Sequence, residues 1–342
     1  MLYPDQLMPF NSLIGNDRIK TLLQRAISEG RIGQSLLMAG PRGVGKYQFA
    51  VALAQALNCA HVEKGDACGD CVICRKIERR EYGDVRTILR ESKDPSIKKD
   101  YKSQFIKIDQ IRELSELAQF RPYEGRRRIF IIDEAEWLRH EAANSLLKTL
   151  EEPPPSSLLV LVTSKPYALI ETIRSRCLLL SFAPLDAAEI ENHLRTKQNK
   201  TAEEARLLAR LSRGSLGQAR EIELEEYLET RNTMLELVET LASSHNDANL
   251  LAASEYLGRR LEKDDFEGHL DTLMVLLADA FYIKLGSQES LTNTDVADRL
   301  ARVAAKITIE QITEWVDRIE QISFALIRNV NRQLAMDAML IT

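Results

Sequence analysis

Short apolar runs alternate with amphipathic segments over the first 185 residues of the chain. The largely apolar runs at 34–39 and 129–132 are too short for helices, and such continuous runs are typical of central parallel strands. Residues 47–58 place apolar side chains at helical spacing. Strands that alternate with helices predict a doubly wound α/β domain. The other elements that we expect in it are strands at 85–89, 158–163 and 177–182 and helices at 108–119 and 142–150.

The pattern changes after Pro184, beyond which the sequence has no proline to interrupt a helix. Three short helices are predicted at 186–196, 202–211 and 215–228. Longer amphipathic helices follow from Arg231 onward, notably at 265–285 and 309–339. The chain is therefore expected to be α/β and then all-α, with an α/β domain at 1–184, a small helical domain at 185–228 and a larger helical domain at 229–342.

Composition and charge narrow the class of protein. Hydrophobic residues make up 44% and charged residues 28% of the 342, which is enough for sizeable cores and excludes a disordered chain. The net charge of −5 hides an asymmetry, because residues 1–185 carry 28 Lys and Arg against 23 Asp and Glu, and the remainder 18 against 28. Any contact with phosphates is thus expected in the front part. The sequence shows no apolar run of membrane-spanning length and no signal segment, which favours the cytoplasm.

A glycine-rich loop separates the first predicted strand from the following helix. Gly40, Gly43 and Gly45 allow backbone N–H groups to surround a phosphate, and Lys46 can reach the outer phosphates of a nucleotide. The next position in such loops is normally Ser or Thr, whose hydroxyl binds Mg²⁺, but here it is Tyr47. A tyrosine hydroxyl extends several ångströms further and cannot take that place unless the loop moves. The alternative is a glycine-rich turn without a ligand.

The strand at 129–132 ends in two acidic residues, Asp133 and Glu134. In a phosphate-loop site Asp133 would hold Mg²⁺ and Glu134 would orient the attacking water. Taken alone, an Asp-Glu pair after a strand is more often a charge pair at a helix N-terminus. Its position about ninety residues after the phosphate loop favours the functional interpretation.

Four of the five cysteines fall within a short insertion after the phosphate-loop helix. Cys59, Cys68, Cys71 and Cys74 match the short spacings of a tetrahedral Zn²⁺ site. The ligand set is complete, so we expect a structural metal and leave out His61, which follows Cys59 by two residues. The alternative is a set of small buried residues.

Further motifs follow the acidic strand. With the phosphate loop and the cysteine insertion, they resemble the bacterial clamp-loader ATPases of the AAA+ superfamily over nearly the whole chain. These motifs are 144–154 (NSLLKTLEEPP), the sensor-1 segment 161–164 with Ser164 at the sensing position, Ser175-Arg176-Cys177, the sensor-2 segment 214–220 with Arg220, and the closing segment 331–336.

The resemblance implies roles for these residues. The α/β domain would bind nucleotide, with Ser164 and Arg220 near its phosphates, the small helical domain would be a lid, and the last domain would be an oligomerisation collar. Arg176 would project as an arginine finger into a neighbouring subunit's ATP site. Without the resemblance, Arg176 would more often be an ordinary salt-bridging residue beside Glu171.

Within the family, the delta-prime subunits of the DNA polymerase III clamp loader fit better than the gamma/tau subunits. Gamma/tau subunits keep Ser or Thr after the loop lysine and usually have further domains, whereas this chain has Tyr47 and ends at the collar. The implied partners are gamma/tau and delta subunits, the sliding clamp and primer–template DNA. ATP with Mg²⁺ is expected to bind poorly and to be hydrolysed slowly or not at all. The alternatives are an active gamma/tau-type motor and a zinc-bearing scaffold that binds no nucleotide.

Overall fold

The computed structural model describes residues 9–90, 105–243, 255, 263–326 and 333. The chain forms two compact units, 1–220 and 221–342. Among the described residues, no helix has the length and apolar character needed to cross a membrane. The predicted closing segment 331–336 and the end of the helix predicted at 309–339 lie largely outside the described residues.

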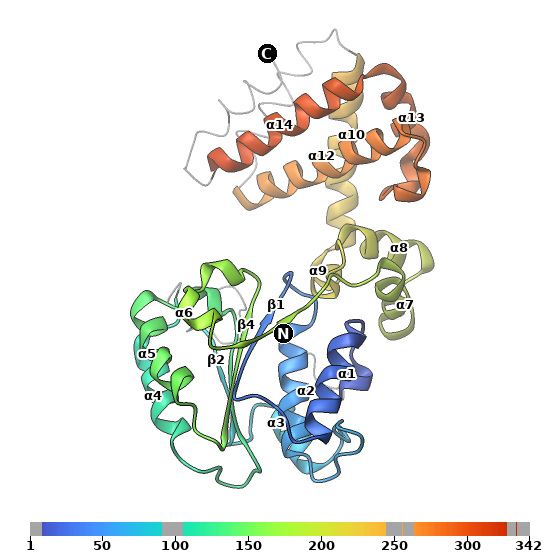
Figure 1. The fold of residues 1–342 in the computed structure, drawn as a ribbon. Coiled ribbons are helices and arrows are strands. Elements are labelled where there is room, and N and C mark those ends of the chain that lie inside the picture. The colour runs from blue at the N-terminus through green and yellow to red at the C-terminus, as the bar shows by residue number, and fades with distance from the viewer. Residues whose placement is uncertain (1–8, 91–104, 244–254, 256–262, 327–332, 334–342) are drawn as a thin grey trace. The chain divides into compact units, whose positions relative to one another are not determined.

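The first unit contains a parallel five-stranded sheet in the order β2-β3-β4-β1-β5, which confirms the predicted α/β class (Figure 1). Leu37 at the centre of β1 lies opposite Leu161 on one side and Leu179 on the other. Because the chain crosses over between parallel neighbours, the loops after the strands converge on one edge of the sheet. The strands are β1 (Ser35–Ala39), β2 (Val85–Ile88), β3 (Arg128–Ile132), β4 (Ser157–Thr163) and β5 (Leu178–Ser181).

Alternate residues of the central strands belong to two separate cores. Ile129 and Ile131 of β3 pack with one group of helices, and Phe130 and Ile132 pack with the other. Burial of both faces explains why these strands are continuously apolar in sequence. The first group is α1 (Asp17–Ser28), α2 (Lys46–Asn58) and α3 (Val72–Glu78), and the second is α4 (Ile108–Ala118), α5 (His140–Glu151) and α6 (Glu171–Arg174), on the other side of the sheet in Figure 1.

Three short helices complete the first unit: α7 (Ala187–Gln198), α8 (Ala202–Leu211) and α9 (Leu216–Glu221). Capping boxes begin α7 at Asp186 and α8 at Thr201, where each side chain accepts a hydrogen bond from a backbone N–H of the first turn. The helix predicted at 215–228 is wrong, because α9 ends at Glu221 and a new helix begins at Leu224.

The second unit is helical, as predicted. Helix α12 (Lys263–Lys284) contacts α10 (Leu224–Ser243), α13 (Ala297–Lys306) and α14 (Ile309–Leu326). A buried polar cluster lies beside this apolar core: Arg231 donates to Asp295 at 2.8 Å, and Asn293 donates to the buried Asp279 from both its backbone and side-chain nitrogens at 2.9 Å. Five short 3₁₀ segments lie among the described residues: η1 (Phe10–Ser12), η2 (Ala135–Trp137), η3 (Pro166–Ala168), η5 (Gln288–Ser290) and η6 (Thr294–Val296).

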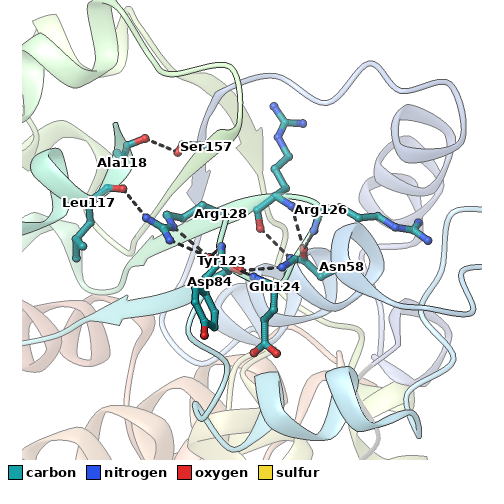
Figure 2. A network of polar contacts seen from close by, with 11 residues as sticks. Asn58, Asp84, Leu117, Ala118, Tyr123, Glu124, Arg126, Arg128 and Ser157 are labelled. Carbon is teal, nitrogen blue, oxygen red and sulfur yellow. Dashed lines mark hydrogen bonds and ion pairs between the residues drawn. The ribbon is translucent and has the colours of Figure 1, made fainter. Parts of the chain in front are cut away.

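The amino end of β3 is fixed by the buried carboxylate of Asp84 (Figure 2). Asp84 accepts hydrogen bonds from the backbone N–H groups of Tyr123, Glu124 and Gly125, each at 2.8 Å. It also pairs with the Arg128 guanidinium at 3.0 Å. Burial acts to raise the pKa of Asp84, but these donors outweigh it and hold that pKa below its usual range.

Asn58, the last residue of α2, binds the same loop (Figure 2). Its Oδ1 accepts from the backbone nitrogens of Arg126 and Arg127 at 2.9 and 3.0 Å, and its Nδ2 donates to the Arg127 carbonyl at 3.1 Å. The helix that begins at Lys46 and the strand that ends before Asp133 are therefore held together at the edge of the sheet remote from those two residues.

Candidate phosphate site and cysteine cluster

The glycine-rich loop connects β1 to α2 at the carboxyl edge of the sheet. Gly43 and Gly45 have φ values of 76° and 98°, in the left-handed region that favours glycine. A Cβ at Gly43 would collide with Ser215, and the Gly43 carbonyl accepts a hydrogen bond from the backbone N–H of Gly217 at 2.9 Å. The loop is thus in contact with the beginning of α9, in the segment predicted as sensor 2.

Lys46 is the first residue of α2 and its side chain is buried. Its Nζ donates to the carbonyl oxygens of Gly40 and Pro41 at 2.7 and 2.6 Å. Burial lowers the pKa of Lys46 to about 8, although the carboxylates of Glu136 and Asp133 oppose this shift. A buried ammonium group at the first turn of a helix is suited to receive an anion.

Two acidic residues after β3 face this lysine. Burial and the neighbouring Glu134 raise the pKa of Asp133 to about 6, while the charges of Lys46 and Arg80 act in the opposite direction. Glu136 accepts a hydrogen bond from the Ser164 hydroxyl at 2.6 Å. That bond holds the pKa of Glu136 below its usual range although burial acts to raise it. The ends of β1, β3 and β4 thus place Lys46, Asp133 and Ser164 on one edge of the sheet.

Glu134 is paired with an arginine. Arg90 donates to Glu134 Oε2 from Nε at 2.9 Å and from Nη2 at 2.7 Å, and its guanidinium lies 4.7 Å from the centre of the Trp137 ring. The Arg90 side chain is 12% exposed and that of Glu134 is 32% exposed, so the pair is partly shielded from water. In this structure Glu134 is held by Arg90, and its predicted role in orienting water stays a prediction.

Tyr47, the residue that departs from the usual loop pattern, points toward β2. Its hydroxyl lies 3.3 Å from Thr87 Oγ1 and accepts a hydrogen bond from Arg80 Nε at 3.0 Å. The Arg80 guanidinium lies 5.2 Å from the centre of the Tyr47 ring, within the range of a cation–π contact.

The two arginines assigned by resemblance have partners within the first unit. Arg176 forms an ion pair with Glu151 at 2.7 Å and donates to the Thr172 carbonyl at 3.0 Å. Glu151 and not Glu171 is therefore its acidic partner in this structure. Arg220 Nη2 lies 2.7 Å from His193 Nε2, and burial together with the Arg220 charge lowers the pKa of His193 to about 4. His193 is consequently neutral at pH 7 and can accept a hydrogen bond from Arg220.

The four clustered cysteines converge on one point. Their sulfur atoms all lie within 4.8 Å of one another, with Cys59 Sγ at 3.5 Å from Cys68 Sγ and 4.0 Å from Cys71 Sγ. Tetrahedral Zn²⁺ with bonds of about 2.3 Å requires sulfur–sulfur distances of about 3.8 Å. Backbone N–H groups also point at the sulfurs, among them His61 N at 3.2 Å from Cys59 Sγ. The donor set and its geometry therefore fit a metal ion with four thiolate ligands.

The cysteine insertion is bonded to elements on both sides of it. Asp66 accepts from the backbone N–H groups of Phe10 and Asn11 at 2.8 and 3.0 Å. On the other side, the buried Gln55 of α2 donates to the Cys74 carbonyl at 2.9 Å. A metal in the cluster would accordingly support the helix that carries the phosphate loop.

Several polar partners of the predicted site residues were not predicted, namely Arg80, Thr87, Arg90, Glu136 and His193. They come from four separate stretches of the chain, since Thr87 and Arg90 lie in and directly after β2, and none of them belongs to a motif. Of these residues, only Glu136 could have been expected at the site from the sequence, since it follows Asp133 by three residues in an acidic stretch.

Comparisons with known proteins agree with this arrangement. The family model for "DNA polymerase III, delta subunit" matches residues 15–186, and that for "DNA polymerase III, delta subunit, C terminal" matches residues 225–342. The chain is 30% identical to DNA polymerase III subunit delta′ of Bacillus subtilis, covering 94% of this chain and 93% of that protein. It is 36% identical to the tau subunit of Escherichia coli, covering 61% of this chain but 32% of tau.

Among solved structures, the RuvB Holliday junction branch migration motor of Thermotoga maritima aligns with 87% of this chain and 90% of its own, at 17% identity and a TM-score of 0.42. A structural similarity this low supports no conclusion about the fold beyond the sheet topology that the structure itself shows. The family matches, by contrast, cover both units of the chain. The chain therefore belongs to the DNA polymerase III delta-subunit family, and it matches subunit delta′ along nearly the whole length of both proteins.

Proposed function

We propose that this chain acts as a delta′-type subunit of the DNA polymerase III clamp loader. In that role it assembles with gamma/tau and delta subunits in the cytoplasm and takes part in loading the sliding clamp onto primed DNA. The observation that carries the proposal is the match to subunit delta′ over 94% of this chain and 93% of the relative. Tyr47, at the position where gamma/tau subunits keep Ser or Thr, favours the same choice.

The domain roles follow from this assignment. Residues 1–184 would form the nucleotide-binding domain, 185–228 the lid and 229–342 the collar through which the subunits assemble. The metal of the cysteine cluster would be Zn²⁺, because four thiolates with tetrahedral spacing are the set that structural zinc sites use. Since no ligand position stays open, zinc would stabilise the fold without taking part in chemistry.

The chain's own nucleotide site would bind phosphates but hydrolyse ATP slowly or not at all. Lys46 and the backbone N–H groups around Gly43 and Gly45 would hold the phosphates, with Asp133 and Ser164 beside them. Arg220, on the helix that touches the loop, would approach the phosphates from the lid. Hydrolysis would suffer because Tyr47 supplies no hydroxyl at the Mg²⁺ position and Glu134 is engaged by Arg90.

Arg176 would act in a neighbouring subunit's ATP site as an arginine finger. Its present partner Glu151 is a weak competitor, because both side chains are partly exposed, at 35% and 49%, and such pairs contribute only about 0–1 kcal/mol. Arg176 can therefore leave Glu151 at little cost when a neighbour presents a triphosphate. Fingers of this kind raise the rate of hydrolysis by roughly 10³–10⁵.

ATP turnover by the reconstituted clamp loader tests this role. We expect Arg176→Ala in this chain to reduce turnover by at least tenfold, and Glu151→Gln to leave it unchanged or raise it. Arg121→Ala, which alters an exposed arginine in the loop before β3, is the matched control. Full activity of the complex with Arg176→Ala would show that this chain supplies no finger.

The second candidate is an active motor of the gamma/tau type, which the retained Lys46, Asp133 and Glu134 favour. It predicts steady ATP turnover by the chain alone that Lys46→Ala abolishes. The third candidate, a zinc-bearing scaffold, predicts that the chain alone neither binds nor hydrolyses ATP.

A further inference from the structure

The phosphate loop and the first turn of α9 lie backbone against backbone. The backbone N–H of Gly217 donates to the Gly43 carbonyl at 2.9 Å. A Cβ added to Gly217 would lie 2.9 Å from the Gly43 Cα, and one added to Gly43 would lie 3.2 Å from the Gly217 Cα. Non-bonded carbon atoms normally stay about 3.5–4.0 Å apart. The two segments can therefore approach this closely only because neither residue has a side chain.

The local backbone gives no reason for a glycine at position 217. Gly217 lies inside α9, and its φ is outside the left-handed region that favours glycine. Inside a helix glycine is less favourable than alanine, because it loses more conformational freedom on folding. The close approach to Gly43 accounts for the residue, so this part of the helix is shaped by its contact with the phosphate loop.

The connection between β5 and α7 is also fixed. Asn16 Oδ1 accepts from the backbone N–H of Ala183 at 2.9 Å, and Asn16 Nδ2 donates to the Ala183 carbonyl at 3.3 Å. Two residues later, Leu185 N donates to the Gly214 carbonyl at 2.8 Å. A hinge must be able to change its φ and ψ angles, whereas this connection is bonded at both ends. The proposed lid is thus held to the α/β domain at two separate places, and both contacts are made by the chain's own atoms.

We propose that Gly217 and Asn16 hold the lid closed on the phosphate loop before any nucleotide binds. The inference deepens the proposed function, because it concerns the lid of the proposed nucleotide site and rests on that assignment. A ligand shifts a conformational equilibrium only by its difference in affinity for the two states. Because the closed state is already the populated one, nucleotide binding has no lid closure left to drive. Arg220, three residues after Gly217, therefore stays on a helix that already contacts the loop.

Hydrogen–deuterium exchange of the full chain, read by mass spectrometry with and without ATP, tests the inference. The reporter is segment 215–219, because it contains the Gly217 N–H that donates to the loop. Gly217→Ala adds a methyl group where the loop leaves no room, although alanine favours the helix itself. Gly268→Ala is the matched control, because it places the same side chain in helix α12, where the added Cβ meets no other part of the described chain within 4 Å.

A second variant, Asn16→Gly, leaves the sequence of α9 unchanged. It frees the backbone groups of Ala183, and glycine suits the left-handed backbone of Asn16, whose φ is 51°. Faster exchange of segment 215–219 in this variant can therefore not come from damage to the helix.

Without nucleotide, segment 215–219 of the wild type should exchange slowly, and ATP should change its rate by less than about twofold. Gly217→Ala and Asn16→Gly should each speed its exchange by at least about tenfold, while α7 and α8 keep the protection that they have in the wild type. Gly268→Ala should leave the rate unchanged.

Three results would overturn the inference. One is exchange of segment 215–219 at the wild-type rate in either variant, and another is a wild type that becomes protected only when ATP is added. The third is loss of protection throughout α7 and α8, since the altered residue would then support folding of the lid and not its closure. None of these results depends on the assembled clamp loader, so the Arg176→Ala test of the proposed function can succeed or fail independently.

Discussion

Replacement of Asp84 by alanine should destabilise the first unit strongly. The carboxylate is 0% exposed and accepts from three backbone N–H groups and from Arg128, whose side chain is only 12% exposed. Removing one partner of a buried ion pair costs about 3–5 kcal/mol. The three backbone donors lie in a loop that water can reach in part, so we expect a loss near the lower end, about 3 kcal/mol.

The two tryptophans allow each unit to be observed separately. Trp137 is the tryptophan of the first unit and Trp315 that of the second. Urea unfolding of Asp84→Ala is therefore followed by Trp137 fluorescence in a Trp315→Phe background. Asp109→Ala is the control, because Asp109 lies 3.6 Å from Arg112 and both side chains are exposed, and such ion pairs contribute little to stability.

The effect of Asp84→Ala should also depend on pH in a defined direction. The folded-state pKa of Asp84 is below its usual range, so its stabilisation is fully present above the unfolded pKa of about 3.9 and is lost as the pH falls through the folded value. The difference between wild type and variant should thus shrink in acid. A loss of less than about 1 kcal/mol at pH 7, or a loss of equal size at pH 3, would refute the reasoning.

Two further predictions concern other parts of the chain. Removal of metal by a chelator, or Cys71→Ser, should lower the melting temperature of the first unit by several degrees, since the insertion is bonded to α2; an unchanged temperature would contradict a structural metal. Arg231→Met should destabilise the second unit by about 1–3 kcal/mol, because it removes hydrogen bonds to Asn293 and Asp295, and Trp315 fluorescence should report it; equal stability would contradict that role.

The sequence predicted the sheet better than the helices around it. Strands β1, β3 and β4 have both faces buried, so they appear as continuous apolar runs and were predicted to within one residue. Helix α1 was not predicted although Ile19, Leu23 and Ile27 recur at helical spacing. Helix α3 begins inside the cysteine cluster, where packing around the sulfurs decides the conformation and periodicity is too short to be seen.

For the candidate site, the sequence motifs identified the site residues but not the side chains that form hydrogen bonds and ion pairs with them. Lys46, Asp133 and Ser164 could be placed on one edge because loops after parallel strands converge there. The pairing of Glu134 with Arg90, forty-four residues away, depends on how the chain packs around Trp137. No pattern of spacing in a single sequence contains that information.

Asp133→Asn should make the protein more stable. Burial and Glu134 hold the pKa of Asp133 at about 6, above the value of about 3.9 expected in the unfolded chain. A raised pKa stabilises the fold below pH 4 and this contribution is lost as the pH rises through 6, so at pH 7.5 the ionised carboxylate opposes folding. The difference between the folded and unfolded pKa values corresponds to a loss of about 3 kcal/mol in the free energy of unfolding. Partial exposure of Asp133 reduces this loss to about 2 kcal/mol.

Urea unfolding of Asp133→Asn, followed by Trp137 fluorescence, should therefore give a gain at pH 7.5 that disappears at pH 4. Asp109→Asn should show no gain at either pH. A destabilised Asp133→Asn at pH 7.5 would mean that Lys46 and Arg80 stabilise the carboxylate more than burial opposes it. The buried Lys46, with its pKa at about 8, opposes folding in the same way, and a bound polyphosphate would reverse that effect. Residues that weaken the fold at neutral pH are expected where a protein keeps a site for an anion.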